Sequence, residues 1–239
     1  MIDDEIKELL TPYDCDLTKT RIGNNGDGGY VVIKELLEKS PIVYSAGVLS
    51  LQAASADFDA ATKYGNKIIK MFDIIPLQKN PNFLAGLLPN MKFYNESVNL
   101  LSLTSRLEKE EHNDLTLLMD IEGGEYFTLT DMNDALLNKF NQICIEVHWI
   151  SDTQKGKEKS CKKEAHKLFK KLNNQFKLIH IHGNNHSPLS KSGMPDVIEL
   201  TYINKNTKTK FEKSKTSCPS HLDFPNKRSR EDYILDWWL

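Results

Sequence analysis

A short stretch of the chain, residues 115–126, ends an apolar run in a group of acidic side chains. Its sequence is LTLLMDIEGGEY, so Asp120, Glu122 and Glu125 surround a pair of glycines. A short apolar run followed by glycine and a helix-like segment is typical of a buried parallel strand. Open α/β sheets bind their ligands at the carboxyl ends of such strands. We therefore expect these acids to face a ligand.

The next strand-like stretch, residues 142–150, adds a further acid and a histidine. In its sequence, QICIEVHWI, polar and apolar residues alternate, so Cys144, Glu146 and His148 share one face of a strand. Burying ionisable groups costs free energy, which favours a chemical role for them over a role in stability. The alternative is that Glu146 and His148 form a buried hydrogen-bonded pair with a structural role alone.

A third strand, predicted at 176–181, is followed by one more histidine. Five side chains would then converge above one edge of the sheet: Asp120, Glu122, Glu146, His148 and His182. Carboxylates with imidazole suit Mg²⁺ or Mn²⁺, and the candidate metal ligands are Asp120, Glu146 and His148. A cation would lower the pKa of an acceptor hydroxyl, whose proton a histidine or glutamate would then take. Without a metal, a Glu–His pair would still provide a general base.

The region before these strands has the order of a nucleotide-binding βα unit. The apolar run 41–48, PIVYSAGV, contains Gly47, and a helix is predicted at 55–64. The next strand, 67–72, is followed by Asp73, about 25 residues after Gly47, a spacing that suits an acid holding ribose hydroxyls. The complete G-x-G-x-x-G pattern is absent, so the prediction of a nucleoside site depends on both halves together.

Two further segments complete the predicted cofactor site. Residues 91–98, MKFYNESV, are either a third strand-to-loop unit beside an adenine or simply a polar loop. Residues 21–32, RIGNNGDGGYVV, are either a β-hairpin or a glycine-rich loop whose amides meet an anion or a polar ligand tail. The cofactor-binding residues predicted in this way are Arg21, Gly29, Tyr30, Gly47, Asp73, Glu96, Ser97 and Asp120.

The alternation of strands and helices predicts an α/β three-layer sandwich with a mostly parallel sheet of about seven strands. We expect a single domain of 239 residues. Its predicted parts are an N-terminal cap and hairpin (1–40), a Rossmann-like core (41–203) and a C-terminal surface excursion and tail (204–239). Further helices are predicted at 3–10, 100–111, 128–140 and 160–172, and an edge strand with Glu199 facing inward at 196–203.

Composition excludes several classes of protein. The formal net charge of −2 argues against a main role in neutralising nucleic-acid phosphates, so no nucleic-acid partner is expected. The apolar runs are short for a membrane span, and the acidic N-terminus does not resemble a signal peptide. The 4 cysteines are scattered without a C-x-x-C pair, which favours a reduced, cytoplasmic protein.

A set of short motifs distributed from about residue 21 to residue 226 resembles the FkbM-like S-adenosylmethionine-dependent methyltransferases. The motifs are DGGY at 27–30, YSAG at 44–47, FD at 72–73, DIEGGE at 120–125, IEVHW at 145–149, HGNN at 182–185, IELTY at 198–202 and DFPN at 223–226. The most similar branch has the DGGY and HGNN motifs, and some of its members methylate sugar hydroxyls. This chain departs from the family in SAGVLSLQAAS, which carries one glycine.

The resemblance implies a Rossmann-like class I methyltransferase that uses S-adenosylmethionine (SAM). Gly47 would lie against the methionine portion of the cofactor, Asp73 would hold its ribose, and Asp120 and its neighbours would face the reacting methyl group. The protein would align an acceptor oxygen for in-line displacement, and His148 or His182 would remove its proton. Asp120 and Glu122 complete the predicted catalytic set. The expected acceptor is a small molecule or glycan, contacted by Asn184 and Asn185.

Two other functions remain compatible with these patterns. One is a nucleotide-sugar enzyme, although the phosphate-binding glycine motif is missing after the first strand of the core. The other is a glycan-binding or assembly module that retains the fold without catalysis. Competition between S-adenosylhomocysteine (SAH) and a nucleotide sugar, and an assay for methyl transfer, would distinguish the three.

Overall fold

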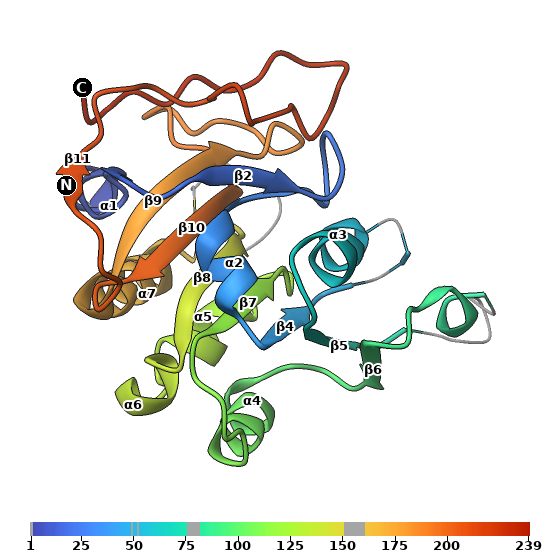
Figure 1. The fold of residues 1–239 in the computed structure, drawn as a ribbon. Helices are drawn as coiled ribbons and strands as arrows, with labels where there is room; N and C mark the ends of the chain where they lie inside the picture. The colour runs from blue at the N-terminus through green and yellow to red at the C-terminus, as the bar shows by residue number, and fades with distance from the viewer. Residues whose placement is uncertain (1, 49, 52, 76–81, 151–160) are drawn as a thin grey trace.

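The computed structural model describes residues 2–48, 50–51, 53–75, 82–150 and 161–239 (Figure 1). A seven-stranded sheet at its centre has the strand order β6-β5-β4-β7-β8-β10-β9. The strands are β4 (Ile42–Ala46), β5 (Ile68–Asp73), β6 (Met91–Asn95), β7 (Leu115–Met119), β8 (Phe140–Val147), β9 (Phe176–Gly183) and β10 (Ile198–Asn204).

The five strands from β6 to β8 pair in parallel, and β10 is antiparallel to both of its neighbours. The prediction that 196–203 forms an edge strand is wrong, because β10 lies between β8 and β9, and β9 is the edge. The inward-facing position predicted for Glu199 is confirmed, with Glu199 6% and Thr201 3% exposed. The alternating pattern did not indicate that a strand pairs with β10 on each side.

Alternate side chains of the central strands enter two separate hydrophobic cores, one on each face of the sheet. In β7, Leu117 and Met119 pack into one core, and Leu118 packs into the other. The first core includes residues of α4 (Leu100–Glu108), α5 (Glu125–Leu129), α6 (Asp134–Leu137) and α7 (Lys162–Gln175), and it includes Ile6 of α1 (Ile2–Leu9). The second includes residues of α2 (Lys34–Lys39), α3 (Ser55–Lys63), β2 (Lys19–Ile22) and β3 (Tyr30–Ile33). The expected three-layer, Rossmann-like α/β sandwich is confirmed.

Two local predictions are decided by turn and cap residues. Strands β2 and β3 pair antiparallel, so the glycine-rich segment between them is the turn of a β-hairpin. The helix predicted at 128–140 is divided into α5 and α6. The division is fixed by Asn133, whose side chain accepts a hydrogen bond from the backbone N–H of Ala135 and so starts a new helix.

The C-terminal segment, residues 218–239, returns to the body of the protein. It lies beside β9 and the hairpin (Figure 1). Leu235 is fully buried and Trp238 is 5% exposed. Before it, β11 (Phe211–Lys213) pairs with β1 (Tyr13–Cys15). Among the described helices, none has the length and apolar character needed to cross a membrane.

Candidate active site

The carboxyl ends of β4 and β7 meet in a contact between two backbones. The N–H of Asp120 donates to the carbonyl of Ala46 at 2.9 Å. Gly47 has a φ of +89°, and a Cβ placed on it would lie 1.5 Å from the carbonyl oxygen of Asp120. Both its conformation and the space around it therefore require glycine.

The acids and the histidine predicted from β7 and β8 converge beside this contact. The Nε2 atom of His148 lies 3.6 Å from a carboxylate oxygen of Asp120, 3.7 Å from one of Glu122 and 3.9 Å from one of Glu146. The imidazole is buried, whereas the side chain of Glu122 is 69% exposed. One ring nitrogen therefore faces a group of oxygen atoms that reaches from the sheet to the solvent.

The other ring nitrogen of His148 faces Glu125, an acid that was expected to face a ligand but was not among the five side chains predicted to converge. Glu125, the first residue of α5, is fully buried, and its Oε1 lies 3.4 Å from Nδ1 of His148. The same oxygen accepts the backbone N–H of Ile121 at 3.0 Å. Because a carboxylate only accepts hydrogen bonds, Glu125 favours the tautomer with the proton on Nδ1. The signal in the sequence was an acid at a helix start directly after the glycine pair.

Burial and mutual repulsion adjust the proton affinities of this cluster. Burial raises the pKa of Asp120 to about 7; nearby His148 opposes the shift and the carboxylates of Glu125 and Glu122 add to it. Burial likewise raises the pKa of Glu146 well above its ordinary value, with Asp120 contributing. Burial lowers the pKa of His148, but Glu125 outweighs it and the net shift is upward. Asp120 can thus exchange a proton near neutral pH.

The backbone around the cluster is strained. Glu122 and Trp149 have positive φ values of 53° and 59°, which is costly for residues with a side chain. Gly123, at φ +90°, lies under the ring of Trp149, and a Cβ there would be 2.4 Å from Cζ3 of that ring. Strain of this kind persists where the surrounding structure fixes a functional geometry.

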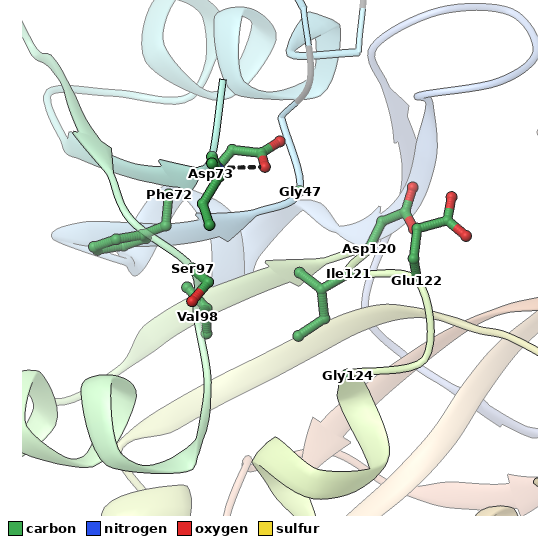
Figure 2. Close-up of a pocket in the computed structure, with 10 residues that line it drawn as sticks. Gly47, Phe72, Asp73, Ser97, Val98, Asp120, Ile121, Glu122 and Gly124 are labelled. Atoms are coloured by element: carbon green, nitrogen blue, oxygen red, sulfur yellow. Dashed lines mark hydrogen bonds between the residues drawn. The ribbon is translucent and has the colours of Figure 1, made fainter. Parts of the chain in front are cut away.

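A cavity of about 240 Å³ lies on one side of Asp120 and Gly47 (Figure 2). Its lining residues come from the carboxyl ends of β4, β5 and β7 and from the segment after β6: Gly47, Phe72, Asp73, Ile74, Ser97, Val98, Asp120, Ile121, Glu122 and Gly124. Four of the predicted cofactor residues are among them, namely Gly47, Asp73, Ser97 and Asp120. Glu96 is not; it pairs with Arg106, which lies 4.3 Å from the ring centroid of Tyr94.

A second cavity of about 340 Å³ lies on the other side of the same contact. It shares Gly47, Asp120 and Glu122 with the first cavity. Its other lining residues are Asp27, Gly28, Tyr30, Ala53, Glu146, His148, Trp149, Asn184, His186, Ser187 and Val197. The amide of Asn184 donates to Oε1 of Glu146 at 2.7 Å and so fixes that carboxylate at the cavity wall.

Two predicted cofactor residues hold the hairpin turn together. The guanidinium of Arg21 donates to the carbonyl oxygens of Asn24 at 2.8 Å, Gly26 at 2.7 Å and Leu222 at 3.2 Å. A Cβ on Gly29 would lie 2.0 Å from the carbonyl oxygen of Asn24. The donors of Arg21 serve backbone carbonyls, so this structure gives it and Gly29 a role in shaping the turn that carries Tyr30.

His182 lies outside the cluster. Strand β10 separates it from β8, its Nδ1 lies 3.1 Å from Glu199, and its Nε2 lies 3.0 Å from Asp232. Burial lowers the pKa of His182, but hydrogen bonds to Asp232 and Glu199 outweigh it and raise the pKa to about 10. Protonated on both nitrogens at neutral pH, His182 has no lone pair to accept a proton. The structure therefore contradicts its predicted role as a base, and His148 is the histidine at the site.

Asn185 is also turned away from the second cavity. It is fully buried, and its Nδ2 donates to the carbonyl oxygens of Lys227, Arg230 and Glu231. Its Oδ1 accepts the N–H of Lys227 at 2.6 Å. With its amide occupied in this way, Asn185 ties down the C-terminal segment and has no contact left for an acceptor.

The set of atoms best placed for a cation differs by one residue from the predicted set. Ligand atoms of Asp120, Glu122 and His148 all lie within 4.8 Å of one another. Glu122 thus stands where the sequence analysis placed Glu146, whose Oε1 accepts the amide of Asn184 instead. Two carboxylates and an imidazole form a donor set that suits Mg²⁺ or Mn²⁺ when waters complete the shell.

No family model matches the chain, and no curated protein matches it in sequence. The structure is similar to that of the O-methyltransferase TomG from Streptomyces achromogenes in complex with SAM, with a TM-score of 0.43 and 10% identity over 72% of this chain and 78% of that one. It is also similar to a fibrillarin pre-rRNA processing protein from Methanococcus jannaschii, with a TM-score of 0.44 and 13% identity over 71% and 68% of the two chains. At these TM-scores and identities, function has to be inferred from the geometry of the site.

Proposed function

We propose that the protein is a SAM-dependent O-methyltransferase that acts on a hydroxyl group of a sugar or glycan. The observation that carries this proposal is the pair of cavities that meet at Asp120 and Gly47. A group-transfer enzyme needs a donor and an acceptor on opposite sides of the reacting atoms, and this arrangement provides both.

The first cavity fits the cofactor. Its wall at Gly47 is backbone without a side chain, and the place of a Cβ there is already taken by the carbonyl of Asp120. Phe72 and Ile121 provide apolar surface there. Asp73 lies at the end of β5, one strand away from Gly47, where a carboxylate can accept hydrogen bonds from ribose hydroxyls. Arg21 and Gly29 would contribute through the turn that they stabilise.

The second cavity fits an acceptor hydroxyl that has to lose a proton. A bound cofactor would supply an electrophilic methyl group, and a C–O bond to the acceptor would form as the S–C electron pair returned to sulfur. Nε2 of His148 accepts the acceptor proton, and Glu125 stabilises the imidazolium that results. Asp120 and Glu146 orient the hydroxyl, and Asn184 holds Glu146 in place.

The first test is calorimetric titration of SAH into metal-stripped protein. Saturable binding at one site per chain is expected, with no competition by a nucleotide sugar. Transfer of a radiolabelled methyl group from SAM to a panel of neutral monosaccharides then identifies an acceptor. A protein that shows neither SAH binding nor thermal stabilisation by SAH is no methyltransferase, and retention of a glycan without cofactor would indicate the binding module instead.

A divalent cation at Asp120, Glu122 and His148 is the alternative form of the proposal, supported by their spacing, in which Nε2 of His148 would hold the ion instead of accepting the proton. The three side chains would hold the ion where it can polarise the acceptor oxygen. We expect Mn²⁺ to bind metal-stripped protein with a dissociation constant that rises sharply in the Glu122→Gln variant. Calorimetry with Mn²⁺ alone tests this, and equal affinity in both proteins would remove the ion from the site.

A further inference from the structure

The outer wall of the second cavity is formed by two loops from different parts of the chain. Asp27 and Gly28 come from the turn of the hairpin, and Asn184, His186 and Ser187 come from the loop after β9. Neither loop is part of the sheet, so their positions depend on contacts made from behind the wall.

The C-terminal segment supplies those contacts. The guanidinium of Arg230 donates to the carbonyl oxygens of Asn185 and His186, each at 3.0 Å. The hydroxyl of Tyr233 donates to the carbonyl oxygen of Ser187.

The hairpin turn is held by the same segment. The amide of Asn226 donates to Oδ1 of Asp27 at 3.4 Å and to Oε1 of Glu199 at 2.6 Å. Arg228 donates to the carbonyl oxygen of Asn25 at 3.1 Å. Both loops of the wall are thus attached to one stretch of chain, residues 226–233.

The C-terminal segment is itself fixed to the sheet on both sides of Asn226. Asp223 lies 2.8 Å from Nε2 of His180, and Asp232 lies 3.0 Å from Nε2 of His182. Both histidines are nearly fully buried on β9. The C-terminal segment therefore connects a rigid strand to both loops of the wall.

We infer that the C-terminal segment determines the acceptor specificity of the enzyme by holding the outer wall of the second cavity, with Arg230 and Tyr233 as positioning residues. This inference rests on the proposed function. Arg230 and Tyr233 touch the wall through backbone carbonyls and are not lining residues of either cavity among those described. Their loss should alter acceptor binding while the cofactor cavity, on the far side of Asp120, keeps its shape.

The experiment compares Tyr233→Phe and Arg230→Lys with Ile234→Thr as a control from the same segment. Tyr233→Phe deletes one hydroxyl, and Ile234 is 74% exposed. Removing one hydrogen bond should raise the KM for the neutral monosaccharide that wild-type protein methylates by about fivefold, with kcat within about twofold. SAH affinity should stay the same, and Arg230→Lys should retain more acceptor affinity than Arg230→Met.

Hydrogen exchange provides a readout that needs no acceptor. Amides of residues 184–188 should exchange faster in Tyr233→Phe than in wild type or Ile234→Thr. Unchanged exchange there, or a loss of SAH affinity equal to the loss of acceptor affinity, would overturn the inference. Failure of wild-type protein to bind SAH would overturn the proposed function and the acceptor role with it, while the exchange result would still decide whether Tyr233 holds the wall.

Discussion

At the scale of single residues, the cluster contains more negatively charged groups than positively charged ones. Asp120, Glu122, Glu125 and Glu146 all lie near one imidazole. Asp120 and Glu146 are protonated more readily than in water, because ionising either of them places a charge in a poorly solvated site beside other carboxylates. The ionised cluster is therefore costly for stability, and Asp120 can exchange a proton near neutral pH.

Asp120→Asn should abolish methyl transfer while the fold stays intact. It should also change stability in a pH-dependent way. The pKa of Asp120 is raised from 3.8 to about 7 in the folded protein, so the folded state binds more protons than the unfolded state between these values, and stability falls as the pH rises. The melting temperature of the variant should therefore exceed that of wild type more at pH 8 than at pH 4.

Asp236→Asn, at an exposed position, is the control for that comparison. Full activity in Asp120→Asn would remove Asp120 from the mechanism. Equal melting temperatures of the variant and wild type at both pH values would show that the carboxyl is not destabilised by burial.

Glu125→Gln should slow methyl transfer by about 10- to 100-fold without unfolding the protein. Glutamine can still accept the N–H of Ile121, but it carries no charge to stabilise the imidazolium of His148. Because Glu125 raises the pKa of His148, its loss should move the acidic limb of the pH–rate profile to lower pH. A profile that keeps its midpoint would show that Glu125 does not act through the histidine.

At the scale of elements, chemistry is concentrated where strands end. The junction of β4 with β7 brings Gly47 against the carbonyl of Asp120, and β8 places Glu146 and His148 in the same space. The edge strand β9 directs its histidines to a different set of partners, in the C-terminal segment. The sheet thus carries the cluster around His148 and, two strands away on β9, the histidines that bind the C-terminal segment.

Gly47→Ala should reduce SAH affinity by about tenfold or more, because a side chain at positive φ costs about 1–2 kcal/mol and here also collides with backbone. Gly65→Ala is a matched control. Gly65 has the same φ of +89°, but the nearest atom to its added Cβ would be 3.7 Å away. Equal SAH affinities in the two variants would show that the close approach at Gly47 does not matter for the ligand.

The contacts of His182 with Glu199 and Asp232 should make the stability of the protein depend on pH. The pKa of His182 is raised from 6.5 to about 10, so the stabilisation by its ion pairs is complete below pH 6.5 and is lost as the pH rises through 10. His182→Gln should therefore lower the melting temperature by about 5–10 °C at pH 6 and by less at pH 10. A constant difference across this range would mean that His182 is neutral in the folded protein.

At the scale of the whole molecule, the sequence predicts where strands lie in the chain more readily than it predicts which strands pair in the sheet. Buried parallel strands such as β4, β7 and β8 leave short apolar runs, and their carboxyl ends meet at one edge, so the convergence of Asp120 with His148 was predictable. The position of β10 was not, because alternating polarity along a strand does not say whether water or protein covers the polar face.

The residues that were misassigned share a physical cause. His182 and Asn185 looked free because their partners, Asp232 and Lys227, lie in a polar segment that resembles solvated surface in sequence. Glu125 was expected to face a ligand, but its contact with His148 was not predicted, because a helix start gives no indication that its side chain points back to the next strand. Pairing between segments far apart in the chain carries no local pattern, and these contacts appear only once the chain is folded.

The backbone contact between Gly47 and Asp120 also links the two cavities thermodynamically. Each cavity is bordered by both residues, and no flexible side chain lies between them to absorb a displacement. A ligand that shifted one loop would therefore change the free energy of binding at the other cavity. By reciprocity, a cofactor and an acceptor bound as proposed would alter each other's affinity by the same factor through this contact.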